Sequence, residues 1–241
     1  MAATIQHIGS EGIPSRCRGC ISRREGFCAG LTAGEISRIH PYVVRKRLPA
    51  GQQVLRQGAA NASYVQVLDG TVKLTAALDE GREQIVGLRF AGDFVGQRFA
   101  REVGYTAEAA TDVEYCRVSK ATLDALADSS REVAHLMHRL VSTELEETRE
   151  LMLALAQRDA RQRVAGLLYR IGRRQSPATQ RARLELPLSR AEIGNYLGLT
   201  VETVSRQLSS LKRDGLIAME RKTLIIVENM GRLAQAAGIT A

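Results

Sequence analysis

The sequence has no apolar run that approaches the roughly 20 residues of a membrane-spanning helix, so we expect no membrane segment. Its first residues, 1–13, lack the charged-then-apolar order of a secretory signal. No segment repeats, and none is of low complexity. These absences predict a cytoplasmic protein. In a reducing compartment, cysteines more often serve metal or redox roles than structural disulfides.

The signatures of common catalytic sites are missing as well. The chain has no Gly-rich phosphate loop, no paired catalytic carboxylates and no nucleophile beside a base, so we do not expect an enzyme. What the chain does have is length and apolar content. Its 241 residues, of which 44% are hydrophobic, are enough for two packed units with sizeable cores.

Charge is distributed unevenly along the chain. Residues 1–157 carry 19 basic and 19 acidic side chains, whereas residues 158–241 carry 15 basic and 7 acidic ones. The whole net charge of +8 therefore lies in the last third. A net-neutral first part and a basic last third suggest a polyanionic partner for the last third, although a solvated basic face would have the same composition.

Residues 31–130 are typical of one short helix followed by many short strands. Thr32 and Glu35 form a capping box at the start of a helix over residues 31–40. Runs rich in Val, Leu, Tyr and Thr then alternate with glycines, which predicts a β-sandwich or β-roll. The predicted strands are Tyr64–Leu68, Thr71–Ala76, Gln84–Phe90 and Tyr115–Val118.

Residues 131–157 predict one long helix, because they contain no Gly or Pro and consist mostly of good helix formers. Side chains recur there with the 4-3-4-3 spacing of a coiled-coil seam. We expect the helix to pair with its own copy; the alternative is packing on the β-unit. Four glutamates between positions 144 and 150 make the seam marginal. The seam residues are Val141, Leu145, Thr148, Met152 and Leu155.

Beyond a basic helix (159–174) and a polar connector (175–187), residues 188–212 carry the signals of a helix-turn-helix. Ser189 and Glu192 form a capping box for a helix from about Arg190 to Leu197. Gly198 then supplies the positive φ of a tight turn, and Thr200 caps the second helix. The inner face of the pair is predicted to consist of Ile193, Leu197, Leu199, Val204, Leu208 and Leu211.

The outward face of the second helix suits base recognition. Positions i, i+3 and i+4 share one face and can enter a major groove together. Arg can bond guanine through two donors, Glu can accept from cytosine N4, and Val can meet a thymine methyl group. The outward residues are Val201, Glu202, Ser205 and Arg206.

A hairpin over residues 216–227 follows, with the basic residues Arg221 and Lys222 at its tip. It is typical of a wing that rests on DNA phosphates. A helical hairpin that touches no DNA is the alternative interpretation. The basic surroundings, the two capped helices and the glycine turn together favour double-stranded DNA as the partner.

The segment from Ala191 to Arg206, with Glu-x-x-Ser-Arg at 202, 205 and 206, resembles the recognition region of the FNR branch of the CRP/FNR transcription regulators. The resemblance spans nearly the whole chain. It implies an α+β fold with a cysteine arm, a β-roll sensor domain, a long dimerisation helix and a C-terminal winged helix-turn-helix. It also implies a homodimer that reads a TTGAT…ATCAA palindrome through Glu202, Ser205 and Arg206.

Cys17, Cys20 and Cys28 have the spacing C-x2-C-x7-C, and Cys116 lies far away at the end of a predicted strand. Four thiolates suit either tetrahedral zinc or an iron–sulfur cluster, and on spacing alone zinc leads. A nucleophilic cysteine is a third reading, unsupported by any histidine close in sequence. The resemblance implies the cluster, because members of this branch bind an oxygen-labile [4Fe-4S] cluster through N-terminal cysteines and one at the position of Cys116.

The arm also departs from some members of that branch. The seven-residue gap before Cys28 is longer than in the enterobacterial members and is similar to that of the rhizobial FnrN-type regulators. A different loop around the cluster could alter its oxygen sensitivity. Neighbouring arginines are expected to favour the ionised thiolates, namely Arg16, Arg18, Arg23 and Arg24.

The same fold also serves cyclic-nucleotide sensors, which hold the cyclic phosphate with a Glu after Gly-x-x-Gly and an Arg-Ser pair further on. Here Gln97 follows the glycine-bounded segment 92–96, and the loop 104–107 contains no arginine. We therefore expect no cyclic nucleotide to bind.

A turn around residue 80 has a family counterpart that touches RNA polymerase. Arg82 stands where an acidic residue is often found, which weakens the expectation of that contact. The acidic residues of the turn are Asp79, Glu80 and Glu83.

Together these observations predict an oxygen-responsive, DNA-binding transcription regulator. Its expected parts are a cluster arm (1–30), a β-roll sensor domain (31–130), a dimerisation helix (131–157) and a winged helix-turn-helix domain (158–241). Two alternatives stay open. One is a zinc-stabilised regulator of the same fold that responds to another signal, and the other is an iron–sulfur enzyme with an accessory DNA-binding domain.

Overall fold

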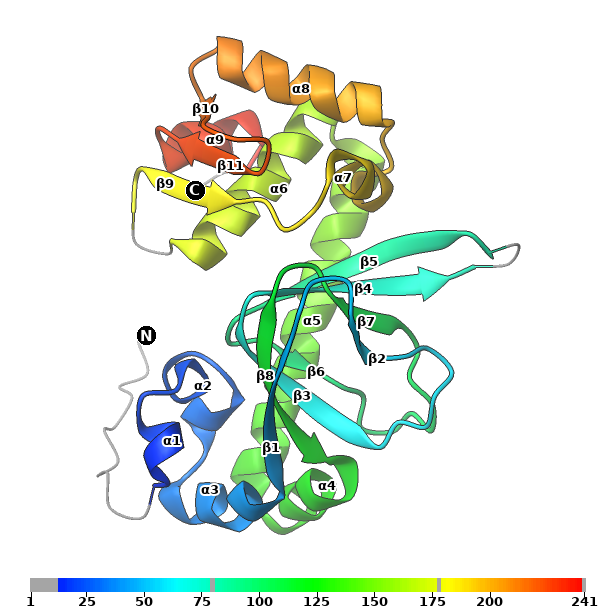
Figure 1. Ribbon diagram of the computed structural model, residues 1–241, viewed down its shortest axis with the longest axis vertical. Coiled ribbons are helices and arrows are strands. Elements are labelled where there is room, and N and C mark those ends of the chain that lie inside the picture. The colour runs from blue at the N-terminus through cyan, green and yellow to red at the C-terminus, as the bar shows by residue number, and fades with distance from the viewer. Residues whose placement is uncertain (1–12, 79–80, 177–178, 240–241) are drawn as a thin grey trace. The chain divides into compact units, whose positions relative to one another are not determined.

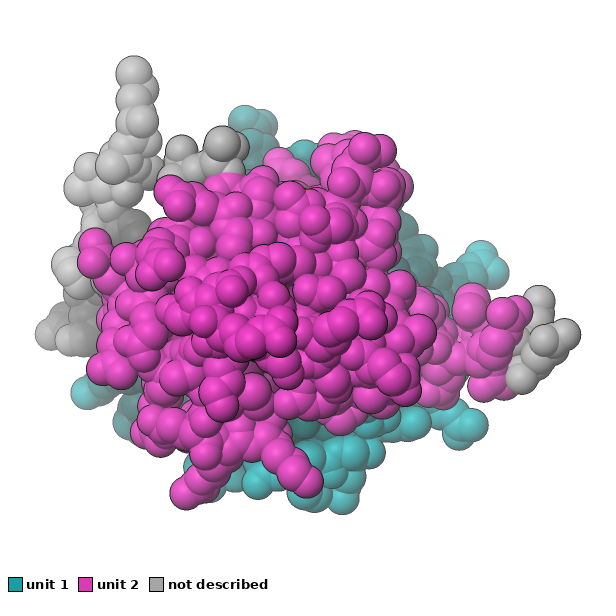
Figure 2. Space-filling model, turned by 90° about the horizontal axis from the view of Figure 1, so that it is seen from above, with its two compact units in different colours: residues 1–74, 88–143 teal, residues 75–87, 144–241 magenta. Residues whose placement is uncertain are grey.

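The computed structural model describes residues 13–78, 81–176 and 179–239 (Figure 1). The chain divides into two compact units (Figure 2). The first unit comprises residues 1–74 and 88–143, and the second comprises residues 75–87 and 144–241. In the described part of the chain, no helix is long and apolar enough to cross a membrane.

The first unit begins with the arm, residues 13–30, which is a set of short helical turns. The capping box predicted after it is present, since Thr32 Oγ1 accepts from the Glu35 N–H at 3.2 Å and a Glu35 carboxylate oxygen accepts from the Thr32 N–H at 2.8 Å. The elements are α1 (Ser15–Arg18), α2 (Ile21–Arg24), η1 (Phe27–Gly30), α3 (Ala33–Ile39) and η2 (His40–Tyr42).

Two four-stranded sheets follow among the described residues, with strand orders β1-β8-β3-β6 and β2-β7-β4-β5. Valines and alanines from both sheets form one core, which confirms the predicted β-roll. The four predicted strands correspond to β3, β4, β5 and β8, and the other four are additional. The bounds are β1 (Val43–Leu48), β2 (Gln53–Leu55), β3 (Ser63–Asp69), β4 (Thr71–Ala77), β5 (Glu83–Phe90), β6 (Phe94–Val95), β7 (Thr106–Ala109) and β8 (Val113–Ser119).

Strand β3 is buried on both faces, and this positions the arm. Val65 and Val67 point into the core between the sheets. The alternate residues point the opposite way, toward the arm and the helices that cover the outer face. Those outward residues are Tyr64, Gln66 and Leu68.

Aromatic rings fasten the arm to this outer face. The Phe27 ring of the arm stacks on Phe94 of β6 with 5.1 Å between centroids, and Phe94 stacks on Tyr64 at 5.2 Å. The Tyr64 hydroxyl donates to Asp124 of α4 (Lys120–Ser129) at 2.7 Å. Since burying a Phe side chain contributes about 1.5–3 kcal/mol, Phe27 alone is a substantial anchor for a short arm.

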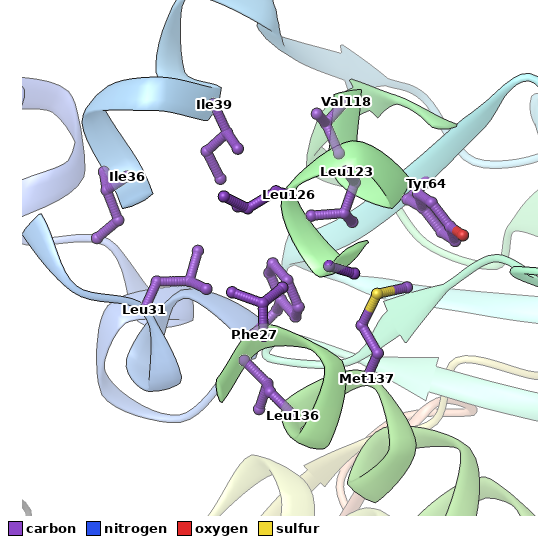
Figure 3. Packing of buried hydrophobic residues seen from close by; sticks show 12 residues of the cluster. Phe27, Leu31, Ile36, Ile39, Tyr64, Val118, Leu123, Leu126, Leu136 and Met137 are labelled. Carbon is purple, nitrogen blue, oxygen red and sulfur yellow. The ribbon is translucent and has the colours of Figure 1, made fainter. Parts of the chain in front are cut away.

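The long helix α5 (Arg131–Gln157) covers the residues that the sequence assigns to it. Its buried side chains, Val133, Leu136 and Met137, all lie in its first two turns. Figure 3 shows Leu136 and Met137 beside Phe27 and the residues of α3 and α4 in one apolar cluster. The start of α5 is therefore fixed to the arm, whereas the remainder buries little.

The second unit contains a helix-turn-helix and a small antiparallel sheet of order β10-β11-β9. The predicted polar connector is partly wrong, because its residues 182–185 form a strand with alternating buried and exposed side chains. The elements are α6 (Ala160–Gln175), β9 (Ala182–Glu185), α7 (Arg190–Leu197), α8 (Val201–Arg213), β10 (Ile217–Met219), β11 (Leu224–Val227) and α9 (Met230–Ala236).

Candidate functional site

All four cysteines of the chain line one pocket, which we call the cysteine pocket. Cys17 lies in α1, Cys20 caps the start of α2, Cys28 lies in η1, and Cys116 lies on β8. Each is partly buried and none is in a disulfide. The rest of the wall is largely apolar and includes Phe27, Ile36, Ile39, Val43, Phe94 and Val118. A sheltered pocket with four thiols suits a group that takes four sulfur ligands.

Polar contacts hold the loop around Cys28 in place. Its backbone N–H donates to Ser22 Oγ at 3.2 Å, and Ser22 is almost completely buried. The Arg23 guanidinium donates to the carbonyl oxygens of Cys28 and Leu31, both at 3.1 Å. The position of Cys28 is thereby fixed by its own arm.

Burial dominates the acidity of the thiols. It raises the pKa of Cys28 to about 11 and that of Cys116 to about 12, and it also raises the pKa of Cys17. Positive charge acts in the opposite direction but is outweighed. The expectation that neighbouring arginines favour the ionised thiolates holds in direction for Arg16 and Arg23, but burial has the larger effect on these thiols. Arg16 and Arg23 do lower the Cys17 pKa, whereas Arg18 and Arg24 are exposed.

Other residues reach the pocket that sequence reasoning missed. Arg45 of β1 lowers the pKa of Cys17 and Cys116, and it is held by Glu114 in an ion pair of 2.8 Å. His40 lines the pocket and accepts from Arg16 Nε at 2.7 Å. Gln66 lines it from β3. These residues lie at positions brought to the pocket by tertiary folding, so no local pattern marks them.

The helix-turn-helix forms as its capping signals predict. Ser189 and Glu192 form the capping box of α7, Gly198 adopts φ 62° in the turn, and the Thr200 hydroxyl accepts from the Thr203 N–H at the start of α8. A Cβ on Gly194 would lie 2.6 Å from the Leu199 carbonyl oxygen, so α7 approaches the turn closely. The predicted inner face is buried except for Leu199, which is half-buried.

The predicted base-reading residues lie at the start of α8. Val201, Glu202 and Arg206 are exposed, and Ser205 is half-buried. The Arg206 guanidinium donates to Thr203 Oγ1 at 3.3 Å, so it lies along the helix surface. The Glu202 backbone N–H and the Thr200 side chain form hydrogen bonds to the Glu202 carboxylate, and these bonds hold its pKa below the usual value. The ionised carboxylate can accept a hydrogen bond from a base.

The wing consists of β10 and β11, with Arg221 and Lys222 exposed at the tip. At its base, Glu220 pairs with Arg183 of β9 at 3.1 Å. That ion pair leaves the two tip cations facing solvent, where phosphate contacts are made.

The predicted seam on α5 is open to solvent in the single chain. Val141 is 59% exposed, Leu145 46% and Met152 61%, while Leu155 is half-buried. Thr148 is exposed and donates from its hydroxyl to the Glu144 carbonyl oxygen at 2.8 Å. Val141 belongs to the same compact unit as the β-roll core, and packing on that core would have buried it, so its exposure argues against that alternative at this position.

Two further expectations concern the β-roll. Asp79 and Glu80 of the acidic turn lie outside the described residues, and Glu83 begins β5. Gly92 and Gly96 adopt φ of 93° and 149°, as turn residues do. The arginine that follows them, Arg98, forms ion pairs with Asp124 and Asp128 on α4.

Two family models match the chain: a cyclic nucleotide-binding domain over residues 45–130 and a Crp-like helix-turn-helix domain over residues 162–236. A probable transcriptional activator of Rhizobium leguminosarum bv. viciae is 40% identical over 92% of this chain and 93% of that protein. The transcriptional activator protein FnrL of Cereibacter sphaeroides is 36% identical over 92% of each. Among solved structures, FixK2 from Bradyrhizobium japonicum has a TM-score of 0.76 at 30% identity, covering 83% of this chain and 99% of that one.

Proposed function

Since the chain belongs to the CRP/FNR family of transcription regulators, we propose that it is an oxygen-responsive member that holds a [4Fe-4S] cluster and binds DNA as a homodimer when oxygen is scarce. Its relatives are named transcriptional activators, and a Crp-like helix-turn-helix model matches this chain, so it is a transcription regulator and not an enzyme. The alternative of an iron–sulfur enzyme with an accessory DNA-binding domain is therefore set aside. The observation that carries the proposal is the convergence of all four cysteines on one pocket.

The spacing of the thiols favours a cluster over zinc. A single zinc with bonds of about 2.3 Å needs sulfurs about 3.8 Å apart. In the part of the chain that the structure describes, no three His, Cys, Asp or Glu side chains lie close enough together to hold one metal ion. The four cysteines nevertheless share a pocket and influence one another's ionisation. A group of several metal ions, with sulfide between its ligands, suits that wider arrangement.

The arm links the cysteines to the long helix. A Cβ on Gly30 would lie only 2.8 Å from Leu136 Cδ2, so the end of η1 is in tight contact with α5. When bound, the cluster supplies the sensitivity to oxygen, because oxidation removes it from its ligands. Cysteines held together reinforce the packing of the arm on the first turns of α5, and released cysteines leave that packing to the arm's own contacts. The result is a population shift between monomer and dimer.

Dimerisation through the α5 seam would place two copies of α8 on a palindromic site. A twofold dimer matches half-sites about one helical turn apart. Glu202, Ser205 and Arg206 are proposed to read the bases of TTGAT…ATCAA, with Val201 beside them and Arg221 and Lys222 on phosphates. RNA polymerase is the proposed further partner, in the cytoplasm. No cyclic nucleotide is proposed as effector, because the β-roll loop at residues 104–107 offers no arginine for its phosphate.

An absorption spectrum of the anaerobically purified protein, with iron and sulfide counts, tests this function. We expect a brown protein with about four irons and four sulfides per chain, since a [4Fe-4S] cluster has that composition. A colourless protein with one zinc per chain would establish the zinc-stabilised regulator instead, because zinc thiolates do not absorb in the visible range.

The equilibrium between monomer and dimer should depend on the charged side chains beside the seam. Thr148 stands at a seam position where the resembled branch places an acidic residue that keeps the cluster-free protein monomeric. We expect Thr148→Asp to raise the anaerobic dimer dissociation constant about tenfold, or ~1.4 kcal/mol, because like charges meet across a parallel seam. Glu144→Ala should raise the aerobic dimer fraction, since Glu144 lies one turn before Thr148.

Sedimentation of each variant, with and without the cluster, measures these effects. Glu150→Ala is the matched control, because by the same heptad register this residue lies opposite the seam. If neither seam variant changes dimerisation, the seam is misassigned. The cluster would then have to control dimerisation through the contact between the arm and α5.

A further inference from the structure

Gln66 is a buried polar residue that the sequence did not single out. Its side chain lies in the cysteine pocket and the residue is only 5% exposed. Its Oε1 accepts from the Phe27 backbone N–H at 3.1 Å. Its Nε2 donates to the carbonyl oxygens of Asp93 at 2.8 Å and Val67 at 3.3 Å. One side-chain amide therefore joins the arm to the β-roll.

The register of the sheet places this amide between two of the cysteines. Gln66 pairs directly with Cys116 across β3 and β8. Residues that pair in this way project on the same face of a sheet, so the Gln66 side chain leaves the sheet beside the Cys116 thiol. Its far end bonds to Phe27, the residue immediately before Cys28.

We propose that Gln66 is the positioning residue that sets the distance between the arm, which carries Cys28, and the strand, which carries Cys116. This role depends on the proposed cluster, because the fixed distance matters only if one group binds both Cys28 and Cys116. Three cysteines of the set belong to one short arm, and the fourth belongs to the β-roll. A group bound by all four requires the two parts at a fixed separation, and the amide spans them.

The chemistry of the contact explains why an amide is needed. The position requires an acceptor for the Phe27 N–H and a donor for the Asp93 carbonyl, and a carboxamide supplies both without charge. Without Gln66, the Asp93 oxygen would keep its bond from the Val67 N–H at 2.9 Å. The Phe27 N–H would lose this acceptor, and a buried unpaired N–H is costly.

The arm backbone also packs closely against Gln66. A Cβ added to Gly26 would lie 2.9 Å from Gln66 Nε2 and 2.9 Å from the Gly92 carbonyl oxygen. Phe27 is itself almost completely buried. The arm therefore meets the sheet in close contact at Gln66.

The first test uses the cluster-free protein and measures hydrogen exchange of the Phe27 amide. We expect Gln66→Met, which keeps the volume and lacks all three hydrogen bonds, to lower Phe27 protection at least about tenfold, or ~1.4 kcal/mol. Gln66→Glu retains an acceptor and should lose less protection. Gln53→Leu is the matched control, because Gln53 is an exposed glutamine of β2. Unchanged protection in a folded Gln66→Met protein overturns the proposal.

The second test follows the loss of visible absorbance in air after anaerobic reconstitution. We expect Gln66→Met to lose its colour several-fold faster than the wild type, with all four cysteines present and Gln53→Leu behaving as the wild type. Lower Phe27 protection with an unchanged rate of colour loss overturns the role in spacing the ligands. A wild-type chain that takes up no iron overturns the proposed function, and the exchange experiment still decides whether Gln66 holds the arm.

Discussion

Cys116→Ser is expected to abolish both the brown colour and anaerobic binding to a palindromic site. Serine keeps the size of the side chain but replaces a soft thiolate ligand by a hydroxyl, which binds iron–sulfur clusters poorly. DNA affinity should fall at least about a hundredfold, or ~2.7 kcal/mol, because the dimer is no longer favoured. The same outcome is expected for the other three ligands, Cys17, Cys20 and Cys28.

Iron analysis, visible absorption and DNA binding under anaerobic conditions measure the three effects together. Ala29→Ser is the matched control, since it introduces the same hydroxymethyl side chain beside Cys28 without removing a thiol. Cys116→Ser is the sharpest of the four variants because this residue comes from the β-roll and not from the arm. Full iron and full activity in that variant would show that the fourth ligand is misassigned.

Arg206→Ala is expected to reduce affinity for a cognate site by about 1–3 kcal/mol and to relax the preference for guanine. The residue is exposed on α8, and its guanidinium has a single weak contact with Thr203 to give up. Arg206→Lys keeps the charge but lacks the planar fork, so it should lose specificity while retaining non-specific binding.

The wing provides the contrasting case. Arg221→Ala or Lys222→Ala should weaken binding to cognate and scrambled DNA alike, and should lower the salt dependence by about one unit each. Titrations with both DNAs over a range of salt concentrations separate the two behaviours. If Arg206→Ala lost affinity equally for both sequences, Arg206 would be shown to contact phosphates and not bases.

Signals confined to a few neighbouring residues predicted the structure well. The capping boxes at Thr32 and Ser189 and the turn at Gly198 depend only on local backbone geometry, and all three are present. The strands that contain the four predictions are seven or eight residues long. The strands that were missed are short, as β2 and β6 are, or exposed and basic at a sheet edge, as β1 is.

The residues of the cysteine pocket could not all be predicted from local sequence patterns. Spacing groups three cysteines, whereas Cys116 joined them only through the count of four thiols and through the family resemblance. Strand pairing brings Gln66 into the pocket and Arg45 beside Cys116, because β8 lies between β1 and β3 and Cys116 pairs with both residues. Sequence alone does not give that register. The predicted domain boundaries stay a prediction, and the compact units divide the chain within α5.

The division of the ligands between the arm and β8 also has a consequence for unfolding. A shared group tethers Cys28 to Cys116, positions about 90 residues apart, and closing a loop of that length in the unfolded chain costs about 4–5 kcal/mol of entropy. Both ends lie in the first unit, so this stabilisation falls on that unit. In calorimetry at concentrations where the protein is monomeric, exposure to air should therefore lower the melting temperature of the first unit and leave that of the second unchanged.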